Sequence, residues 1–326
     1  MSAADFQSAL NPAAAESAHI VHLWWIFFWV TLLIFTLVAI FLFIAILRNI
    51  RRAPDDSQLA IMPEPAQASE NFATKVVSAL VVITVLILFA LLICDFFTGN
   101  AIYATPDPNA LSIKITGHQW WWEVEYEDPQ PSDIVTTANE IHVPVGKPVK
   151  LELQSSDVIH SFWVPNIHGK KDLVPGHPTT TWFTARRMGE FRGQCAEYCG
   201  EQHAHMRLVF IAEAPDAFSS WLAAQKKSAP EPMSDSQRRG RDVFLAAQCV
   251  MCHTIQGTKA RATLGPDLTH IARRKMIAAG QLPNTRGYLA GWILNASALK
   301  PGVRMPPNQL SSDDLNSLLD YLESLK

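Results

Sequence analysis

Four of the five cysteines lie in two short segments, "CAEYCGEQHAHM" at residues 195–206 and "CVMCH" at residues 249–253. Cysteine thiolate, histidine imidazole and methionine thioether are ligands for copper, zinc and iron, so both segments could bind a metal or a metal-containing cofactor. In each segment a histidine follows the cysteine pair closely. We therefore expect the chemistry of this chain to take place at these two positions.

In "CVMCH", Cys249 and Cys252 are three residues apart and His253 follows directly. This spacing is typical of covalent c-type haem attachment, because both thiols can add to the two vinyl groups of one porphyrin and the adjacent imidazole then reaches the iron. A methionine thioether on the other side raises the reduction potential of the iron. We expect Met305 in "GVRMPPN" to supply it, because two prolines stiffen that segment. Met276, in "ARRKMIAAG", is the other candidate, and we expect it in a helix or at a helix end.

Two other interpretations of the "CVMCH" segment are a redox-active cysteine pair and half of a zinc site. A thioredoxin-like pair requires a βαβ context, and the surrounding sequence is helical. A structural zinc site usually requires a second Cys or His pair, and only His270 follows. Haem attachment is therefore the prediction.

The other segment combines two cysteines, a histidine and a methionine, and "DVIHSFWVP" supplies a second histidine upstream. A blue-copper site takes two histidines, one cysteine and a weak methionine ligand, so this chain has one thiolate more than that site needs. Two bridging thiolates can instead hold two copper ions, each completed by one histidine, with the methionine and a backbone carbonyl as weak outer ligands. A Cys2His2 zinc site leaves the methionine unused, and a disulfide leaves the histidines unexplained. The predicted ligands are His160, Cys195, the carbonyl of Glu197, Cys199, His203 and Met206.

Two uncharged runs, residues 23–47 and 76–94, are long enough to cross a bilayer, which takes ~20 apolar residues as a helix. We expect membrane helices over about residues 22–48 and 75–98. Arg48, Arg51, Arg52 and Lys75 flank the connection between them, and basic flanks stay on the cytoplasmic side. Both ends of the chain are then expected on the periplasmic side. The net charge of −3 gives no basic footprint for nucleic acid.

The sequence after the hairpin divides into a strand-rich and a helix-rich part. Apolar and polar residues alternate in "LSIKIT" (111–116) and again around residues 141–145 and 149–153, which predicts an all-β sandwich at 108–213. A linker is expected at 214–236, with a short helix at the centre of the segment and a stretch rich in Pro, Ala and Ser at 228–236. Residues 237–326 predict a small all-α module, because "SSDDLNSLLDYLESL" combines a helix-capping pattern with an apolar stripe. The N-terminal tail and the hairpin occupy residues 1–107.

Over residues 20–213 the chain resembles subunit II of cytochrome c oxidase, which carries the dinuclear copper centre CuA. The resemblance rests on two membrane spans followed in order by "GHQWWWEVEY", "DVIHSFWVP", "KKDLVPG" and "GQCAEYCGEQHAHM". Residues 237–326, with "CVMCH" and "GPDL", resemble a class I cytochrome c domain. The whole chain is therefore similar to the haem-c-fused subunit II of some bacterial oxidases, which implies a cupredoxin-like Greek-key fold for the sandwich.

The resemblance also implies roles for further residues and for partners. Trp120 lies where the family has the aromatic residue at which electrons enter, and Asp172 and Glu197 match carboxylates linked to a magnesium ion shared with subunit I. The implied partners are a soluble or membrane electron donor, the lipid bilayer, the catalytic subunit I and also subunit III, in a bacterial inner membrane.

We expect an electron relay that passes electrons from the donor through haem c and CuA to subunit I, which reduces oxygen to water. No turnover is expected from this chain alone. The linker is expected to raise the effective concentration of the cytochrome domain. A nitric oxide reductase using the same relay and a membrane-anchored copper-binding or sensor protein are the alternatives.

Overall fold

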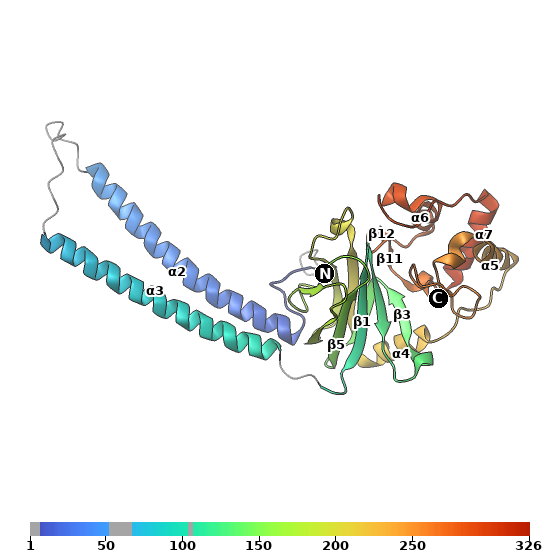
Figure 1. Cartoon of the computed structure of the whole chain (residues 1–326), viewed down its shortest axis with the longest axis horizontal. Coiled ribbons are helices and arrows are strands. Elements are labelled where there is room, and N and C mark those ends of the chain that lie inside the picture. The colour runs from blue at the N-terminus through green and yellow to red at the C-terminus, as the bar shows by residue number, and fades with distance from the viewer. Residues whose placement is uncertain (1–6, 52–66, 104–106) are drawn as a thin grey trace. The chain divides into compact units, whose positions relative to one another are not determined.

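The computed structural model describes residues 7–51, 67–103 and 107–326 (Figure 1). Arg52, one of the basic residues expected on the cytoplasmic side, lies outside these ranges. The chain forms two compact units, one of residues Met1–Ala18 with Thr105–Lys326 and the other of His19–Ala104. The first unit holds every predicted metal and haem ligand, and the second holds most of the apolar hairpin.

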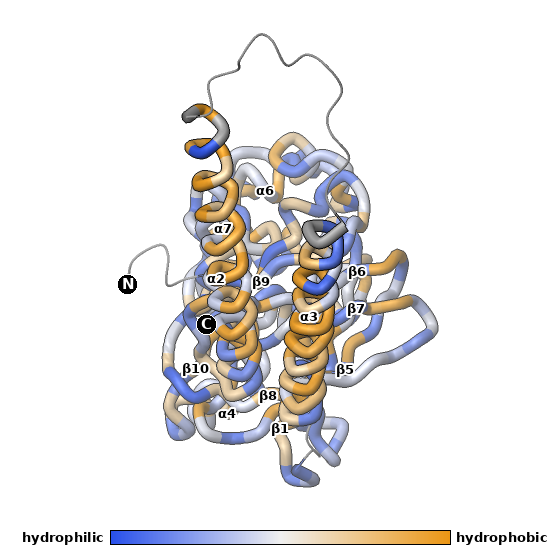
Figure 2. Tube along the Cα trace, turned by 90° about the vertical axis from the view of Figure 1, so that its left-hand side faces the viewer, coloured by the Kyte–Doolittle hydropathy of each residue, from blue (hydrophilic) through white to orange (hydrophobic). Residues whose placement is uncertain are grey.

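Two long helices, α2 (Ala15–Arg51) and α3 (Gln67–Ile102), account for the uncharged runs. Both are long and apolar enough to cross a membrane. Apolar residues occur on all sides of each helix, as Figure 2 shows by its orange colouring, and their side chains are exposed in the isolated chain. A helix that is apolar all round is suited to lipid rather than to water. The two apolar helices expected near the N-terminus are therefore confirmed.

Ten strands form a sandwich of two five-stranded sheets. The sheet orders are β3-β2-β1-β5-β8 and β4-β10-β9-β6-β7. The β1–β5 and β4–β10 pairs are parallel, whereas the other pairs are antiparallel. The bounds are β1 Leu111–His118, β2 Trp121–Tyr126, β3 Val135–Ala138, β4 Glu140–Pro144, β5 Pro148–Ser155, β6 His160–Trp163, β7 Lys171–Leu173, β8 Thr179–Thr184, β9 Gly189–Cys195 and β10 Arg207–Glu213.

The alternation of apolar and polar residues along the strands explains why two sheets pack face to face. In β1 the side chains of Ile113 and Ile115 are fully buried, and in β5 those of Val149 and Leu153 are as well. Burying an aliphatic side chain of this size contributes about 1.5–3 kcal/mol. The predicted all-β sandwich is confirmed, and its inner faces form one continuous core that includes both cysteines of the 195–206 segment.

The first half of the predicted linker packs on the sandwich as helix α4 (Pro215–Gln225). Its Trp221 stacks on the His142 ring at 4.1 Å and meets the Tyr126 ring edge-on at 5.1 Å. A short helix was expected at the centre of this segment, and its apolar face explains why it is held against β4.

The C-terminal domain is small and mainly helical, as predicted. Ser234 caps helix α5 and Ser311 caps helix α7, each by accepting a backbone hydrogen bond from the third residue after it. The elements are α5 Asp235–Ala246, η4 Gln248–Met251, η5 Ile271–Arg273, β11 Met276–Ile277, β12 Leu282–Pro283, α6 Arg286–Leu299 and α7 Ser312–Ser324.

One local expectation is wrong. Met276 lies in the short strand β11, which pairs with β12, and not in a helix. Three consecutive left-handed residues follow it: Ala278, Ala279 and Gly280 have φ angles of 54°, 57° and 73°. A left-handed backbone cannot continue an α-helix, so the chain reverses here.

Candidate metal centre and haem site

The predicted copper ligands come from three neighbouring strands of one sheet. His160 begins β6, Cys195 ends β9 and Met206 directly precedes β10. Phe162 in β6 pairs with Cys195 in β9, which fixes the register between the histidine and the cysteine. The loop after β9 then brings Cys199 and His203 back over the same sheet end.

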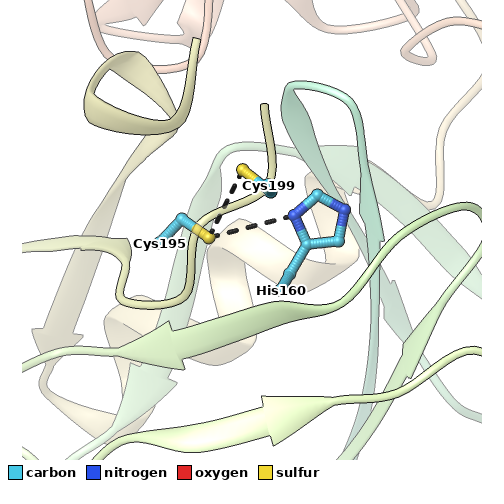
Figure 3. Close-up of side chains that lie close together, drawn as sticks. All are labelled: His160, Cys195 and Cys199. Carbon is cyan, nitrogen blue, oxygen red and sulfur yellow. Dashed lines mark hydrogen bonds between the residues drawn. The ribbon is translucent and has the colours of Figure 1, made fainter. Parts of the chain in front are cut away.

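Four sulfur and nitrogen contacts join the predicted ligands. The sulfur atoms of Cys195 and Cys199 are 3.7 Å apart, and the Nδ1 atom of His160 lies 3.8 Å from the sulfur of Cys195 (Figure 3). The Nδ1 atom of His203 lies 3.7 Å from the sulfur of Cys199, and the Met206 sulfur lies 3.9 Å from it. Each histidine therefore faces a different cysteine.

The chemistry of the donor set fits copper. His160, Cys195, Cys199 and Met206 are all buried, and the ligand atoms of the first three lie within 4.8 Å of one another. The backbone carbonyl of Glu197 is 3.2 Å from the sulfur of Cys195 and could serve as a weak ligand. Thiolate, imidazole and thioether together favour copper over hard cations.

The two thiols differ in acidity because they share a hydrogen bond. The hydrogen bond between Cys195 and Cys199 lowers the pKa of Cys195 and raises the pKa of Cys199. Burial disfavours the charged form, so it opposes the lowering of the pKa at Cys195 and adds to the rise of the pKa at Cys199. The hydrogen bond with His160 further favours the Cys195 thiolate, and the pKa of Cys195 stays below its ordinary value. One thiolate is thus favoured before any metal arrives.

Asp157 is a residue of the site that the sequence interpretation missed. Its Oδ1 atom is 2.9 Å from Nε2 of His160, and its Oδ2 atom accepts a hydrogen bond from the backbone N–H of Gln119 at 2.7 Å. A carboxylate on one ring nitrogen orients the imidazole and leaves the other nitrogen free for a metal. The spacing of three residues in "DVIH" is the only sequence signal for this pair.

Trp120 lies directly against the loop that carries the cysteines. Its indole N–H donates to the backbone carbonyl of Cys199 at 3.0 Å, and the side-chain amide of Gln119 donates to the same oxygen at 2.8 Å. Gly200 approaches the indole so closely that a Cβ there would lie 3.0 Å from an indole carbon. The indole is therefore in contact with the predicted copper loop.

The predicted magnesium carboxylates lie at the surface near the copper loop. Asp172 accepts hydrogen bonds from the Ser161 hydroxyl at 2.7 Å and from Lys170 at 3.1 Å, and these bonds lower the pKa of Asp172. The ammonium group of Lys170 also lies 4.0 Å from the Glu197 carboxylate. Lys170 thus lies close to both carboxylates in the isolated chain, and magnesium binding stays a prediction.

One ring nitrogen of His253, the predicted iron ligand, is already hydrogen-bonded to the backbone. Its Nδ1 atom is 2.8 Å from the carbonyl oxygen of Pro266, and burial lowers the pKa of His253, which favours the neutral imidazole. Gly265 packs so closely on the ring that a Cβ there would lie 2.7 Å from it. Cys249 lies in the preceding turn η4 and Cys252 directly follows it, and this arrangement fits a covalently attached haem.

Comparisons with known proteins match both halves of the chain. Residues 111–213 match the family model "Cytochrome C oxidase subunit II, periplasmic domain", and residues 237–326 match "Cytochrome c". Cytochrome c oxidase subunit 2 of Alkalihalophilus pseudofirmus is 36% identical over 298 residues, which cover 89% of this chain and 83% of that protein. The chain belongs to the cytochrome c oxidase subunit II family.

Other relatives of subunit II match smaller parts. The Bacillus subtilis subunit 2 is 30% identical over 67% of this chain and 63% of its own length. The solved periplasmic domain of subunit II from Bradyrhizobium japonicum is 33% identical, with a TM-score of 0.35, over 38% of this chain and 97% of that domain.

Membership of the family settles the general role of the chain. It is an oxidoreductase subunit of a haem-copper oxidase, with a copper-binding sandwich of the subunit II type and a fused cytochrome c domain that implies haem. The family implies a complex with subunit I, and the two apolar helices indicate a membrane anchor for a periplasmic domain.

Proposed function

We propose that this subunit II accepts electrons at its cytochrome domain, passes them to its copper domain and delivers them to subunit I, which reduces oxygen to water. The observation that carries the proposal is the convergence of two thiols, two imidazoles and a thioether on one sheet end, in a chain that also carries "CVMCH". A copper-storage or sensor protein has no need for a haem-attachment segment such as "CVMCH".

The residues of this chain would hold the two redox groups in rigid surroundings. Cys249, Cys252 and His253 would hold the haem, with Met305 as the expected second axial ligand. Three of the predicted copper ligands, His160, Cys195 and Met206, lie at the ends of neighbouring strands, which limits how far they can move when the charge changes. Haem iron and the copper pair would each supply reversible one-electron chemistry.

The topology proposed for the chain places both of its ends outside the cytoplasm. The backbone N–H of Ala13 donates to the carbonyl of Asn166 at 2.7 Å, and the carbonyl of Ala13 accepts from Arg186 at 2.7 Å. The segment before the first membrane helix is therefore attached to the copper domain, and both must lie on the same side of the membrane. The positive flanks favour the periplasmic side for that face.

Variants of the two sites in the purified oxidase complex test the order of transfer. His203→Asn should leave reduction of the haem by a soluble donor intact but stop oxygen consumption, because one copper loses its imidazole. His177→Asn changes an exposed histidine outside both sites and serves as the control. Oxygen consumption that survives His203→Asn would contradict the proposed order. Nitric oxide reduction in place of oxygen reduction by the same complex would favour the alternative enzyme.

A further inference from the structure

A short segment of the cytochrome domain, residues 300–304, contacts the copper domain beside Trp120, and we call it the cap. Lys300 is 3% exposed, and its ammonium group donates to the backbone carbonyls of Trp120 at 3.0 Å, His205 at 2.9 Å and Ala278 at 3.2 Å. An ammonium group has three donors, so the three carbonyls satisfy it fully. Two of these acceptors belong to the copper domain and one to the cytochrome domain.

Gly302 of the cap covers the indole of Trp120. It has a φ of +82°, and a Cβ there would lie 3.2 Å from the outer edge of that indole. Gly200 of the copper loop packs on the same indole, and only 9% of Trp120 is exposed. Arg304 adds a hydrogen bond from its guanidinium to the side-chain carbonyl of Gln119 at 3.2 Å. The tryptophan is thus enclosed between one glycine of each domain.

A second hydrogen bond next to Lys300 joins the same two domains. The backbone N–H of Arg207, directly after Met206, donates to the carbonyl of Ala279 at 3.1 Å. Ala278 and Ala279 have φ angles of 54° and 57°, which cost free energy for residues with a Cβ and persist where surrounding contacts hold them. Their carbonyls bind Lys300 and Arg207, which supplies that support.

We propose that the cap shields Trp120 from external donor proteins, that Lys300 is the positioning residue that holds the cap, and that electrons pass from the cytochrome domain to the copper domain through this contact. The inference rests on the proposed function. Met305, the expected iron ligand, follows the cap directly, while Trp120 donates to the carbonyl of Cys199. A single electron would move from the reduced haem to the oxidised copper pair, with no bond made or broken.

Two variants in the purified, fully loaded oxidase test this, each with a matched control. Lys300→Met keeps the length of the side chain and removes all three donors, and Lys259→Met changes an exposed lysine of the same domain. Gly302→Ala places a Cβ at a left-handed position, 2.6 Å from a carboxylate oxygen of Glu201 and 3.2 Å from the Trp120 indole. Gly287→Ala is the control because a Cβ there meets nothing within 4 Å.

The first readout is hydroxyl-radical oxidation of Trp120, resolved by mass spectrometry, which does not depend on electron transfer. We expect Trp120 to be oxidised at least about fivefold faster in Lys300→Met and Gly302→Ala than in the wild type and both controls. The second readout is the rate of copper reduction after photoreduction of the haem. We expect that rate to fall at least about tenfold, with the spectra and reduction potentials of both groups unchanged.

Failure of the cap proposal and failure of the proposed function give different results in these measurements. Unchanged oxidation of Trp120 in both variants would overturn the cap. Faster oxidation with an unchanged transfer rate would overturn the route through this contact. If the wild type moves no electron between the two groups, the proposed function fails, and the Trp120 oxidation still decides whether the cap exists.

Discussion

One histidine of each site, His160 and His253, is oriented by a hydrogen bond at the ring nitrogen that does not face the site. His160 presents Nδ1 to Cys195 because its Nε2 meets the Asp157 carboxylate, whereas His253 keeps Nε2 free because its Nδ1 meets the Pro266 carbonyl. Such partners fix the tautomer and the direction of the ligand lone pair. The two sites use opposite nitrogens for the same purpose.

Loss of Asp157 should weaken copper binding without removing a ligand. We expect Asp157→Ala to lose copper to a chelator at a concentration about 10–100 times lower than the wild type needs, the usual effect of removing such a partner. Asp133→Ala, which removes surface contacts with Lys226 and Ser132, is the control. Equal copper retention in the two variants would show that Asp157 does not position His160.

The choice between the two methionines can be made by substitution. We expect Met305→Leu to lower the haem reduction potential by about 0.1 V or more, within the roughly 0.8 V range that axial ligands set. Met276→Leu should leave it unchanged. A potential titration followed by haem absorption measures both, and the reverse pattern would assign the ligand to Met276.

The ligands could be predicted from the sequence because their donor types and spacing are local. Cys195, Cys199 and His203 lie within nine residues, and "CVMCH" is contiguous. Lys300 could not be predicted, because its acceptors on Trp120 and His205 are 180 and 95 positions away. Nothing in "ALKPGVRM" distinguishes it from a surface lysine.

Among the elements, helices α5 and α7 cross so closely that only glycine fits at one position. A Cβ on Gly240 would lie 1.9 Å from the carbonyl oxygen of Ser317 and 2.8 Å from the Cβ of Tyr321. Both helices would have to move apart, which costs about 1–3 kcal/mol or more.

We therefore expect Gly240→Ala to lower the melting temperature of the cytochrome domain by several degrees, roughly 4–8 °C per kcal/mol for a domain of this size. Haem absorption during heating reports on this domain alone. Gly287→Ala has open space at its Cβ and should melt like the wild type. A Gly240→Ala melt that coincides with it would contradict the close crossing.

The packing of α4 on the sandwich should depend on pH through His142. Burial alone would lower the pKa of His142, but hydrogen bonds with Glu140 and Glu213 outweigh it, and the net effect raises the pKa. A raised pKa in the folded state means that the charged imidazole stabilises the fold below its ordinary pKa of about 6.5. That stabilisation is lost as the pH rises through the raised value.

Hydrogen exchange of the α4 amides, corrected for the intrinsic pH dependence, measures this effect because Trp221 of α4 stacks on His142. We expect protection to fall as the pH rises above about 6.5, by at most about tenfold per pH unit, the limit for one proton. His142→Gln should flatten the profile. An equal slope in that variant would assign the pH dependence to another group.

The strands and the α7 helix could be predicted, because alternation and capping act within a few residues. Ser311 caps α7 as the pattern in "SSDD" indicates. The strand and chain reversal at Met276 could not be predicted from the sequence. They depend on Ala278 and Ala279 adopting a left-handed backbone, which residues with a Cβ disfavour. Contacts with Lys300 and Arg207, distant in sequence, accompany that conformation.

For the whole molecule, the central question is whether the cytochrome domain is tethered or docked. The composition of residues 228–236 favours a flexible tether, which stays a prediction. The backbone of Ala229 nevertheless donates to Gln256 at 3.0 Å, and His270 lies 3.0 Å from the carbonyl of Lys227. These contacts attach residues 227–229 to the cytochrome domain, while Glu231 and Met233 are exposed.

Cleavage at a protease site inserted between Glu231 and Met233 distinguishes the two cases. If the cap holds the domains together, the cleaved cytochrome domain should remain with the oxidase during gel filtration, and turnover should keep its salt dependence. A flexible tether predicts release of the domain and a strong new dependence on salt and on added soluble cytochrome. Release from the wild type would contradict docking through the cap.

The proposed relay depends most directly on two copper ions sharing Cys195 and Cys199 in a chain that also carries haem. Electron paramagnetic resonance of the purified, oxidised chain, with an optical spectrum of the reduced haem beside it, measures both at once. We predict a copper signal whose hyperfine splitting is shared equally by two nuclei, together with a c-type haem band. A signal from one copper, or zinc in its place, would mean that Cys195 and Cys199 do not share two copper ions and would contradict the proposed relay.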